Sequence, residues 1–294
     1  MTQRLLLLNG VAVIGAVLNH ALGWGFTSLF WWTDRYAAVT VPDFSMLGTP
    51  TYYVLRVLEQ LATFCPPAFL FVSGYFVAFA ADRHTGRLKW SGVRNRLKTL
   101  LVPYALWSLV IFLGRGAEGS VDSVAGYADK LLMGQAAEPY YYIPVLTQLY
   151  LLAPLMVVLF KRYPKAILAI AAVTQIGVQV ARYPAMLGSS LGWAVWLGQA
   201  PGWLFPHMVF WFVLGGVAGF HLNAFRQWLK DNRGWLAWAT VLLTVAAIVE
   251  WELLQRISGQ EWLAPRPTAL DSLFSLAFVL TFLSLTESRQ LSSP

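Results

Sequence analysis

The sequence predicts an all-α fold, a polytopic membrane helix bundle, and three observations support this class. Of its 294 residues, 57% are hydrophobic and 12% are charged, and that charged fraction is about half the value typical of a soluble domain. The mean hydropathy is +0.57. The apolar residues also gather in long runs, and a helix needs about 20 of them to cross a bilayer. These runs predict about eight transmembrane helices in a single domain over residues 1–294.

The predicted spans are joined by short polar connections, and the sequence contains no soluble domain, low-complexity linker or clear internal repeat. The fifth span is the weakest, because Thr174, Gln175 and Gln179 interrupt its apolar run. The first span also has the basic start of a signal peptide, but the spans that follow it favour a retained helix. The predicted spans lie near residues 5–26, 61–81, 97–114, 141–160, 165–181, 204–222, 234–250 and 268–286.

Lysine and arginine are distributed unevenly between the two ends of these spans. With eight spans, 14 of the 21 cations fall on one side, and the positive-inside rule assigns that side to the cytoplasm. The sequence therefore predicts that both termini are cytoplasmic. This loop placement explains the net charge of +7, and the sequence has no Lys/Arg-rich tail, so a nucleic-acid partner is not expected.

His20 is the most informative of the few reactive side chains. The single Cys65 excludes an intramolecular disulfide, and no Cys/His cluster has metal-ligand spacing, so no metal site is predicted. His20 interrupts an apolar span, where a titratable group marks a functional site or a helix–helix contact. It lies about 22 Å along the first span, in the outer half of the membrane under the predicted topology. The residues alone leave open a catalytic histidine and one bonded to a neighbouring helix or to interfacial water.

A basic connection precedes the third span. Its six cations within sixteen residues can anchor the loop beside anionic lipid. They can also hold the phosphates of a cytosolic cofactor, because the planar guanidinium of arginine binds phosphate through two hydrogen bonds. Charge alone favours the first interpretation. The six residues are Arg83, Arg87, Lys89, Arg94, Arg96 and Lys98.

Four segments, taken in order, resemble the motifs of the acyltransferase 3 family of integral membrane acyltransferases. The first is similar to a first-span motif in which a histidine follows an arginine by eleven positions. The second is similar to a Phe-rich Ser-Gly-aromatic segment, the third to a basic start of the third span, and the fourth to a Tyr-Leu-Leu-x-Pro segment. The resemblance covers roughly residues 4–220. The segments are residues 9–20, 69–75, 94–104 and 142–154, with a weaker match at 210–216.

The resemblance implies an enzyme of the bacterial inner membrane that moves an acyl group, usually acetyl, from a cytosolic acyl-CoA to a hydroxyl of an extracytoplasmic glycan. Polysaccharide O-acetylation is a typical outcome. The implied partners are acyl-CoA, a carbohydrate or lipid-linked glycan acceptor, and membrane lipid. No permanently bound cofactor is expected, because acyl-CoA is a substrate.

The resemblance, together with residue chemistry, assigns roles on the donor side and at the centre of the reaction. His20 is expected to act as the general base that takes the acceptor's hydroxyl proton, since imidazole titrates near working pH. A transient acyl carrier is the alternative role. Arg94 and Arg96 are expected to bind the phosphates of acyl-CoA, and Asn9 is expected to contribute to the same donor-binding site.

Three further residues are assigned to the substrate path. Ser73, with Gly74, is expected to allow close helix approach beside the acyl chain, although small-residue helix packing explains the pair equally well. Tyr150 is expected to hydrogen-bond into a central cavity, with a packing tyrosine as the alternative. Glu59 is expected at the outer end of the second span, where it can orient His20 or remain a solvated interfacial acid.

The sequence departs from the family pattern in two places. Asn9 occupies the position of the family's first-span arginine, so it can donate hydrogen bonds there but supplies no positive charge. The family usually has about ten spans, so this chain is expected to be shortened or truncated after Pro294. These departures keep a catalytically silent homologue as an alternative. A transporter or flippase of a glycan or lipid-linked substrate is the other alternative, and it would favour inverted repeats.

Overall fold

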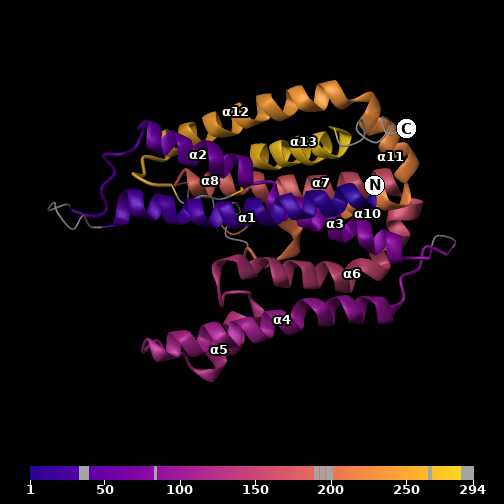
Figure 1. Cartoon of the computed structure of the whole chain (residues 1–294), viewed down its shortest axis with the longest axis horizontal. Helices are drawn as coiled ribbons and strands as arrows, with labels where there is room; N and C mark the ends of the chain where they lie inside the picture. Colours follow the sequence, from indigo (N-terminus) through magenta and orange to yellow (C-terminus); the bar gives the residue numbers. More distant parts are fainter. Residues whose placement is uncertain are drawn as a thin grey trace, which may run out of the picture. The chain divides into compact units, whose positions relative to one another are not determined.

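A computed structural model describes residues 1–32, 40–82, 85–188, 192, 196, 201–263 and 267–285. The described residues form helices and no β-strand, which confirms the all-α class (Figure 1). Within them, six helices are long and apolar enough to cross a membrane, and a bent helix pair can supply a seventh span. A further apolar helix, α13 (Ala269–Leu285), is shorter. Arg83 and His84 of the basic connection lie outside the described residues.

The chain forms two compact units. Unit 1 comprises residues 1–69, 179–198 and 223–294, and unit 2 comprises residues 70–178 and 199–222. The helices wholly or mainly in unit 1 are α1 (Thr2–Trp31), α2 (Pro50–Ala62), α8 (Arg182–Met186), α11 (Leu222–Asp231), α12 (Arg233–Ser258) and α13. Those wholly or mainly in unit 2 are α3 (Cys65–Ala80), α4 (Trp90–Ala117), α5 (Val124–Leu132), η1 (Glu138–Tyr141), α6 (Tyr142–Arg162), α7 (Pro164–Val180), η2 (Phe205–His207) and α10 (Val209–Phe220).

In unit 1, α1 packs closely against the antiparallel segment formed by α2 and the start of α3. A Cβ atom on Gly15 would lie 2.5 Å from the Cys65 Sγ atom, and one on Gly25 would lie 3.2 Å from a methyl carbon of Leu55. Glycine at these two positions therefore allows a close approach of the helices. The two contacts also define how the two segments are aligned. Gly15 faces Cys65 and Gly25 faces Leu55, so each step toward the C-terminus of α1 corresponds to one step toward the N-terminus of the facing segment.

The other helix pair of unit 1 is α12 and α13, which lie side by side (Figure 1). The hydroxyl groups of Thr240 and Thr281 are 2.9 Å apart and join the two helices by a hydrogen bond. The Thr240 hydroxyl also donates to the Leu236 carbonyl oxygen at 2.9 Å, so it can accept the hydrogen bond from Thr281. Such hydroxyl contacts between helices stabilise their packing in an apolar environment.

An aromatic cluster closes one end of unit 1. Phe26, Phe30 and Tyr52 are buried, and the Trp262 ring lies 5.3 Å from that of Phe26 and 5.0 Å from that of Phe30. Such ring pairs contribute about 0.5–1.5 kcal/mol each beyond area burial. The cluster joins the end of α1 to the start of α2 and to the connection between α12 and α13.

The start of α2 differs from the sequence-based prediction. The apolar pattern places the second span at 61–81, but the helical segment that can cross a membrane begins at Pro50 and ends at Ala80. Pro50 follows Thr49, whose side-chain oxygen accepts a hydrogen bond from the Tyr52 amide, so local capping favours a helix start here. The prediction began too late because the apolar run leaves out Arg56 and Glu59, whereas the helix includes both residues.

The fifth span is confirmed, since Pro164–Met186 is long and apolar enough to cross a membrane. The two glutamines that interrupt its apolar run bond to other helical segments. In unit 2, Gln175 Oε1 accepts a hydrogen bond from the Phe210 amide at 3.1 Å. In unit 1, Gln179 Nε2 donates to Ser272 Oγ at 2.7 Å.

In unit 2, α3 and α10 approach each other at backbone distance. A Cβ atom on Gly74 would lie 2.0 Å from the Phe212 carbonyl oxygen, and one on Gly215 would lie 1.9 Å from the Phe71 carbonyl oxygen. Neither position leaves room for a side chain. Gly74 therefore allows α3 to pack closely against α10. Because Ser73 precedes Gly74 on α3, this contact also limits where Ser73 can lie in unit 2.

Candidate active site

His20 lies on α1 between the two glycine contacts that define the helix register. Interpolation between these contacts puts His20 at the level of Gln60, one residue from Glu59, because both helices rise by about 1.5 Å per residue. Its side chain is partly exposed, and within the described part of the chain it forms no hydrogen bond or ion pair. The partly exposed imidazole therefore lies close to the level at which α2 carries the Glu59 carboxylate.

The carboxylate of Glu59 is paired with Arg56, one helical turn earlier on α2. Only 7% of the Arg56 side chain and 18% of the Glu59 side chain is exposed. The Arg56 guanidinium also lies 4.4 Å from the centroid of the Trp251 ring and 5.8 Å from that of Phe26. Charged groups inside a membrane protein are costly unless paired, so the carboxylate and the two ring faces together compensate this cation.

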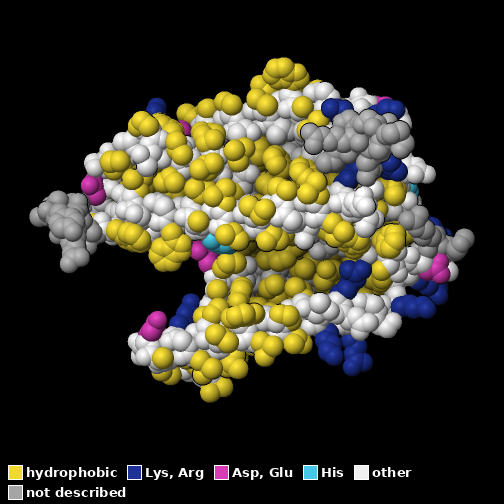
Figure 2. Space-filling model, in the orientation of Figure 1, with side chains coloured by type: hydrophobic (Ala, Val, Ile, Leu, Met, Phe, Trp, Pro, Cys, Tyr) yellow, Lys and Arg dark blue, Asp and Glu magenta, His cyan; other side chains and the backbone are white. Residues whose placement is uncertain are grey.

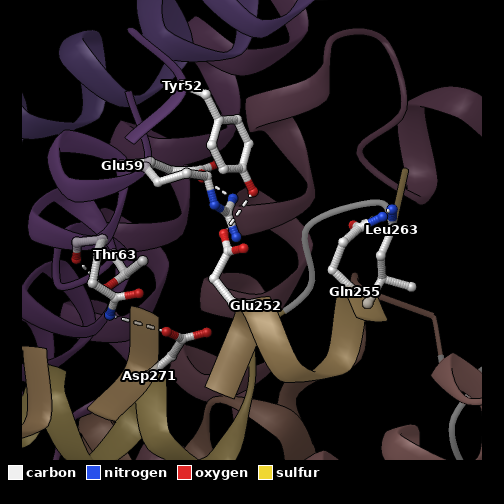
Figure 3. A network of polar contacts seen from close by, with 9 residues as sticks. Tyr52, Glu59, Thr63, Glu252, Gln255, Leu263 and Asp271 are labelled. Carbon is white, nitrogen blue, oxygen red and sulfur yellow. Dashed lines mark hydrogen bonds and ion pairs between the residues drawn. The ribbon is translucent and has the colours of Figure 1, made fainter. Parts of the chain in front are cut away.

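Further polar contacts extend from α2 to α12 and α13 (Figure 3). Gln60 Nε2 donates to Asp271 Oδ1 at 3.0 Å. The Tyr52 hydroxyl donates to Glu252 Oε1 at 2.8 Å, and Figure 3 shows these two side chains pointing toward one another. Each of the two carboxylates, Glu252 and Asp271, therefore accepts a hydrogen bond from another helix. This pattern indicates a structural role for both acids.

Asp271 also caps the start of α13. The Thr268 amide donates to Asp271 Oδ2 at 2.9 Å, and the Asp271 amide donates to the Thr268 hydroxyl at 3.1 Å. This reciprocal pair is a capping box. Nearby, the Tyr183 hydroxyl bonds to Glu250 and accepts from the Ala269 amide at 3.2 Å. The end of unit 1 that carries Glu59 is therefore a network of polar contacts between helices.

This network was not predicted from the sequence, apart from Glu59. A signal existed for one part of it: Arg56, Glu59 and Gln60 have the spacing of one helix face. No local signal connects them to Glu252 or Asp271, which lie about 200 residues later.

Three predicted residues come together in unit 2. Arg96 donates from Nη2 to the Phe76 carbonyl oxygen at 2.8 Å, and its guanidinium lies 5.8 Å from the Tyr150 ring centroid. The Tyr142 hydroxyl hydrogen-bonds the Ser73 side chain and lies in the vicinity of Tyr150, which is on the same helix α6. Tyr142 was not assigned a role from the sequence, although it begins the fourth motif segment. Ser73, Arg96 and Tyr150 therefore belong to one group of side chains.

Arg94 and Asn9 do not join these groups in the described structure. Arg94 is exposed on the second turn of α4, and Asn9 is partly exposed on α1 in unit 1. Figure 2 shows Lys and Arg side chains gathered along the N-terminal part of α4, where Arg94 and Lys98 are both exposed. These exposed cations are in a position to contact either anionic lipid headgroups or a phosphorylated ligand, the two alternatives that the sequence leaves open.

Outside the spans, Asp43 organises the connection from α1 to α2. Its Oδ1 atom accepts a hydrogen bond from the Ser45 amide at 2.9 Å, which lowers the pKa of this carboxyl. Its own amide donates to the Phe30 carbonyl oxygen at 2.8 Å. The part of the connection around Asp43 is therefore held against the end of α1, on the same side as the aromatic cluster.

The helices and their buried polar contacts define a polytopic integral membrane protein. Residues 5–293 match the family described as "Acyltransferase domain", the acyltransferase 3 family. The chain belongs to this family, and the match extends beyond the motif segments in residues 4–220. No curated protein and no solved structure matches the chain.

Proposed function

We propose that this protein transfers an acyl group, usually acetyl, from a cytosolic acyl-CoA to a hydroxyl of an extracytoplasmic glycan or related acceptor in the bacterial inner membrane. Family membership supports a membrane acyltransferase. The observation that carries the proposal furthest is the helix register, which puts the available imidazole of His20 level with Glu59. A histidine oriented by a carboxylate is suited to activating a hydroxyl group, and Glu59 is proposed for that orienting role.

In the proposed reaction, His20 takes the proton from the acceptor hydroxyl as its oxygen attacks the thioester carbonyl carbon. The carbon–sulfur bond then breaks, the acyl group stays on the acceptor oxygen, and the CoA thiolate takes a proton from the imidazolium. Glu59 is proposed to orient the imidazole, and Arg56 keeps the charge of Glu59 compensated. Arg56 and Glu59 are therefore positioning residues in this mechanism.

The donor is proposed to bind at the cytoplasmic side through Arg94 and Arg96. Arg94 is exposed and can bind phosphate directly. Arg96 is held by the Phe76 carbonyl oxygen and by the Tyr150 ring, so its guanidinium is pre-oriented. Asn9 is proposed to contribute hydrogen bonds to the donor without charge. The assignment of Arg94 and Arg96 to the cytoplasmic side follows from the positive-inside rule, by which both termini are also cytoplasmic.

Ser73 and Tyr150 are proposed to line the path of the acyl chain or acceptor. This assignment is supported by the position of the Tyr150 ring beside Arg96, the proposed donor-binding cation, and by the hydrogen bond between Ser73 and Tyr142. The partners are then acyl-CoA, a carbohydrate or lipid-linked glycan acceptor, and the surrounding lipid.

The proposal is tested by following two labels on the donor in membrane vesicles that contain the protein. Acyl label should enter the glycan fraction and be released by hydroxylamine as expected for an ester, whereas label on the CoA moiety should remain soluble. Vesicles from cells lacking the protein are the control. Glycan movement across the membrane that needs no acyl-CoA, with no label incorporated, would support the transporter alternative instead.

A further inference from the structure

Thr147 lies on α6, and its hydroxyl oxygen is buried without a hydrogen-bond partner among the residues that the structure describes. Threonines inside helices can donate instead to the backbone carbonyl oxygen four residues earlier. The Thr147 hydroxyl does not form this bond, so it keeps its capacity to donate. Other threonines in the described helices do form it, at 2.8–3.0 Å: Thr27, Thr99, Thr240 and Thr244.

The unpaired hydroxyl of Thr147 is costly for the fold. A buried hydroxyl without a hydrogen bond destabilises a protein relative to an apolar group of the same shape, and valine supplies such a group. The residue as a whole is partly exposed, so this position of α6 is open to the surface of unit 2. An unpaired polar group at such a position suits contact with a ligand that supplies the missing acceptor.

The position of Thr147 relates it to the proposed donor site. Tyr150 follows it by three residues, so the two side chains are neighbours on one face of α6. The Tyr150 ring centroid lies 5.8 Å from the Arg96 guanidinium, which is proposed to bind the phosphates of acyl-CoA. Under the predicted topology α6 runs toward the cytoplasm, so Thr147 lies about 4.5 Å farther toward the outer side than Tyr150. It therefore lies in the direction in which the thioester must reach.

The same face of α6 also offers a hydrogen-bond acceptor. Pro154 is inside this helix and has no amide hydrogen, so the Tyr150 carbonyl oxygen loses its regular helical hydrogen bond. A donor at Thr147 and an acceptor at Tyr150 are thus about one helical turn apart. Between its phosphates and its thioester, acyl-CoA has a pantetheine arm, whose amide groups each carry one N–H donor and one carbonyl acceptor. The two groups on α6 complement an arm of this kind.

We propose that the Thr147 hydroxyl donates a hydrogen bond to an amide carbonyl oxygen of the pantetheine arm of acyl-CoA, and that the Tyr150 carbonyl oxygen accepts from an amide N–H of that arm. This inference rests on the proposed function, which puts the phosphates of the donor at Arg96. Thr147 is then a donor-binding residue that orients the arm between the phosphates and the thioester.

The test compares two probes by isothermal titration calorimetry of the purified full chain in detergent. Thr147→Val should weaken binding of CoA about fivefold, because one hydrogen bond is lost. Binding of adenosine 3′,5′-bisphosphate, which has the phosphates of CoA but no pantetheine arm, should not change. Thr147→Ser keeps the hydroxyl and should bind CoA like the wild type. Thr244→Val is the matched control, since the Thr244 hydroxyl is already bonded to the Thr240 carbonyl oxygen.

Thermal unfolding without ligand gives a second measurement with an opposite sign. Thr147→Val should raise the unfolding temperature by about 1–3 °C, because it removes an unpaired buried hydroxyl. A lower unfolding temperature would overturn the inference, since it would assign the hydroxyl a bond within the fold.

Unchanged CoA binding in Thr147→Val, or equal weakening of both probes, would overturn it as well. Failure of the proposed function gives different results. A wild-type chain without affinity for CoA would remove acyl-CoA as the donor, and the inference with it. The expected binding pattern without any acyl transfer would contradict the proposed reaction and leave the role of Thr147 supported.

Discussion

The Arg56 guanidinium lies 4.4 Å from the ring centroid of Trp251 and forms an ion pair with Glu59 in the same helix. This contact joins α2 to α12 inside unit 1 and fixes a charge pair at the level of His20. A buried pair of this kind is costly to break, because removing one partner leaves an uncompensated charge. The stability of unit 1 therefore depends on this pair, and in the proposed mechanism the orientation of His20 depends on it as well.

Arg56→Met should destabilise the protein by about 2–3 kcal/mol, less than a fully buried pair because Glu59 keeps some exposure. Thermal unfolding in a single detergent measures the loss. Because the stranded carboxylate causes the loss, Arg56→Met/Glu59→Gln should recover more than half of it. Equal destabilisation of the single and double variants would mean that lost contact with Trp251, and not charge, dominates.

Glu59→Gln should lower kcat by about tenfold to a hundredfold and leave the KM for acyl-CoA unchanged, because orientation of a general base affects only the chemical step. Glu59→Asp should restore part of the rate. Glu252→Gln is the matched control, since Glu252 is a nearby acid bonded to Tyr52. A similar kcat loss in both glutamine variants would assign Glu59 a structural role only.

Arg94→Gln should raise the KM for acyl-CoA about tenfold without a change in thermal stability, because an exposed charged hydrogen bond to phosphate is lost. Arg96→Gln should raise the same KM and also lower the unfolding temperature, since Arg96 holds the Phe76 carbonyl oxygen. Arg162→Gln, another exposed cation, should leave KM unchanged. An unaltered KM in Arg94→Gln would remove Arg94 from the donor site.

Gly215→Ala should prevent folding of unit 2 or destabilise the protein by more than about 3 kcal/mol, because its Cβ atom would lie 1.9 Å from a backbone carbonyl oxygen. Gly177→Ala is the control, since a Cβ atom there meets nothing within 4 Å. The yield of monodisperse protein and its unfolding temperature measure both variants. Normal folding of Gly215→Ala would contradict the close α3–α10 contact.

The sequence was sufficient to predict the helical membrane fold, because apolar runs of span length leave few alternatives. The sequence-based prediction was less accurate where a membrane-spanning helix contains charged residues. The second span was predicted to begin at residue 61, but the helical segment begins at Pro50. Sequence spacing could suggest that Arg56 and Glu59 share a face. It could not reveal the Trp251 ring that makes burial of the cation possible.

Individual residues of the candidate site were predicted from the sequence, but the contacts between them were not. The resemblance singled out Ser73, Arg96 and Tyr150 separately, and only the packing of unit 2 brings them together with Tyr142. In unit 1, His20 and Glu59 were predicted at one level, and the glycine contacts of α1 support that level. Long-range partners such as Asp271 depend on tertiary contacts that no local pattern encodes.

The central claim is that His20 is the base of an acyl transfer reaction. It is tested most directly by measuring transfer of labelled acetyl from acetyl-CoA to membrane glycans with wild type, His20→Ala and the neighbouring control Asn19→Ala at equal protein levels. We predict that label incorporation is lost in His20→Ala, by at least about a hundredfold, and retained in Asn19→Ala. Incorporation by His20→Ala at the wild-type rate would contradict the proposed mechanism.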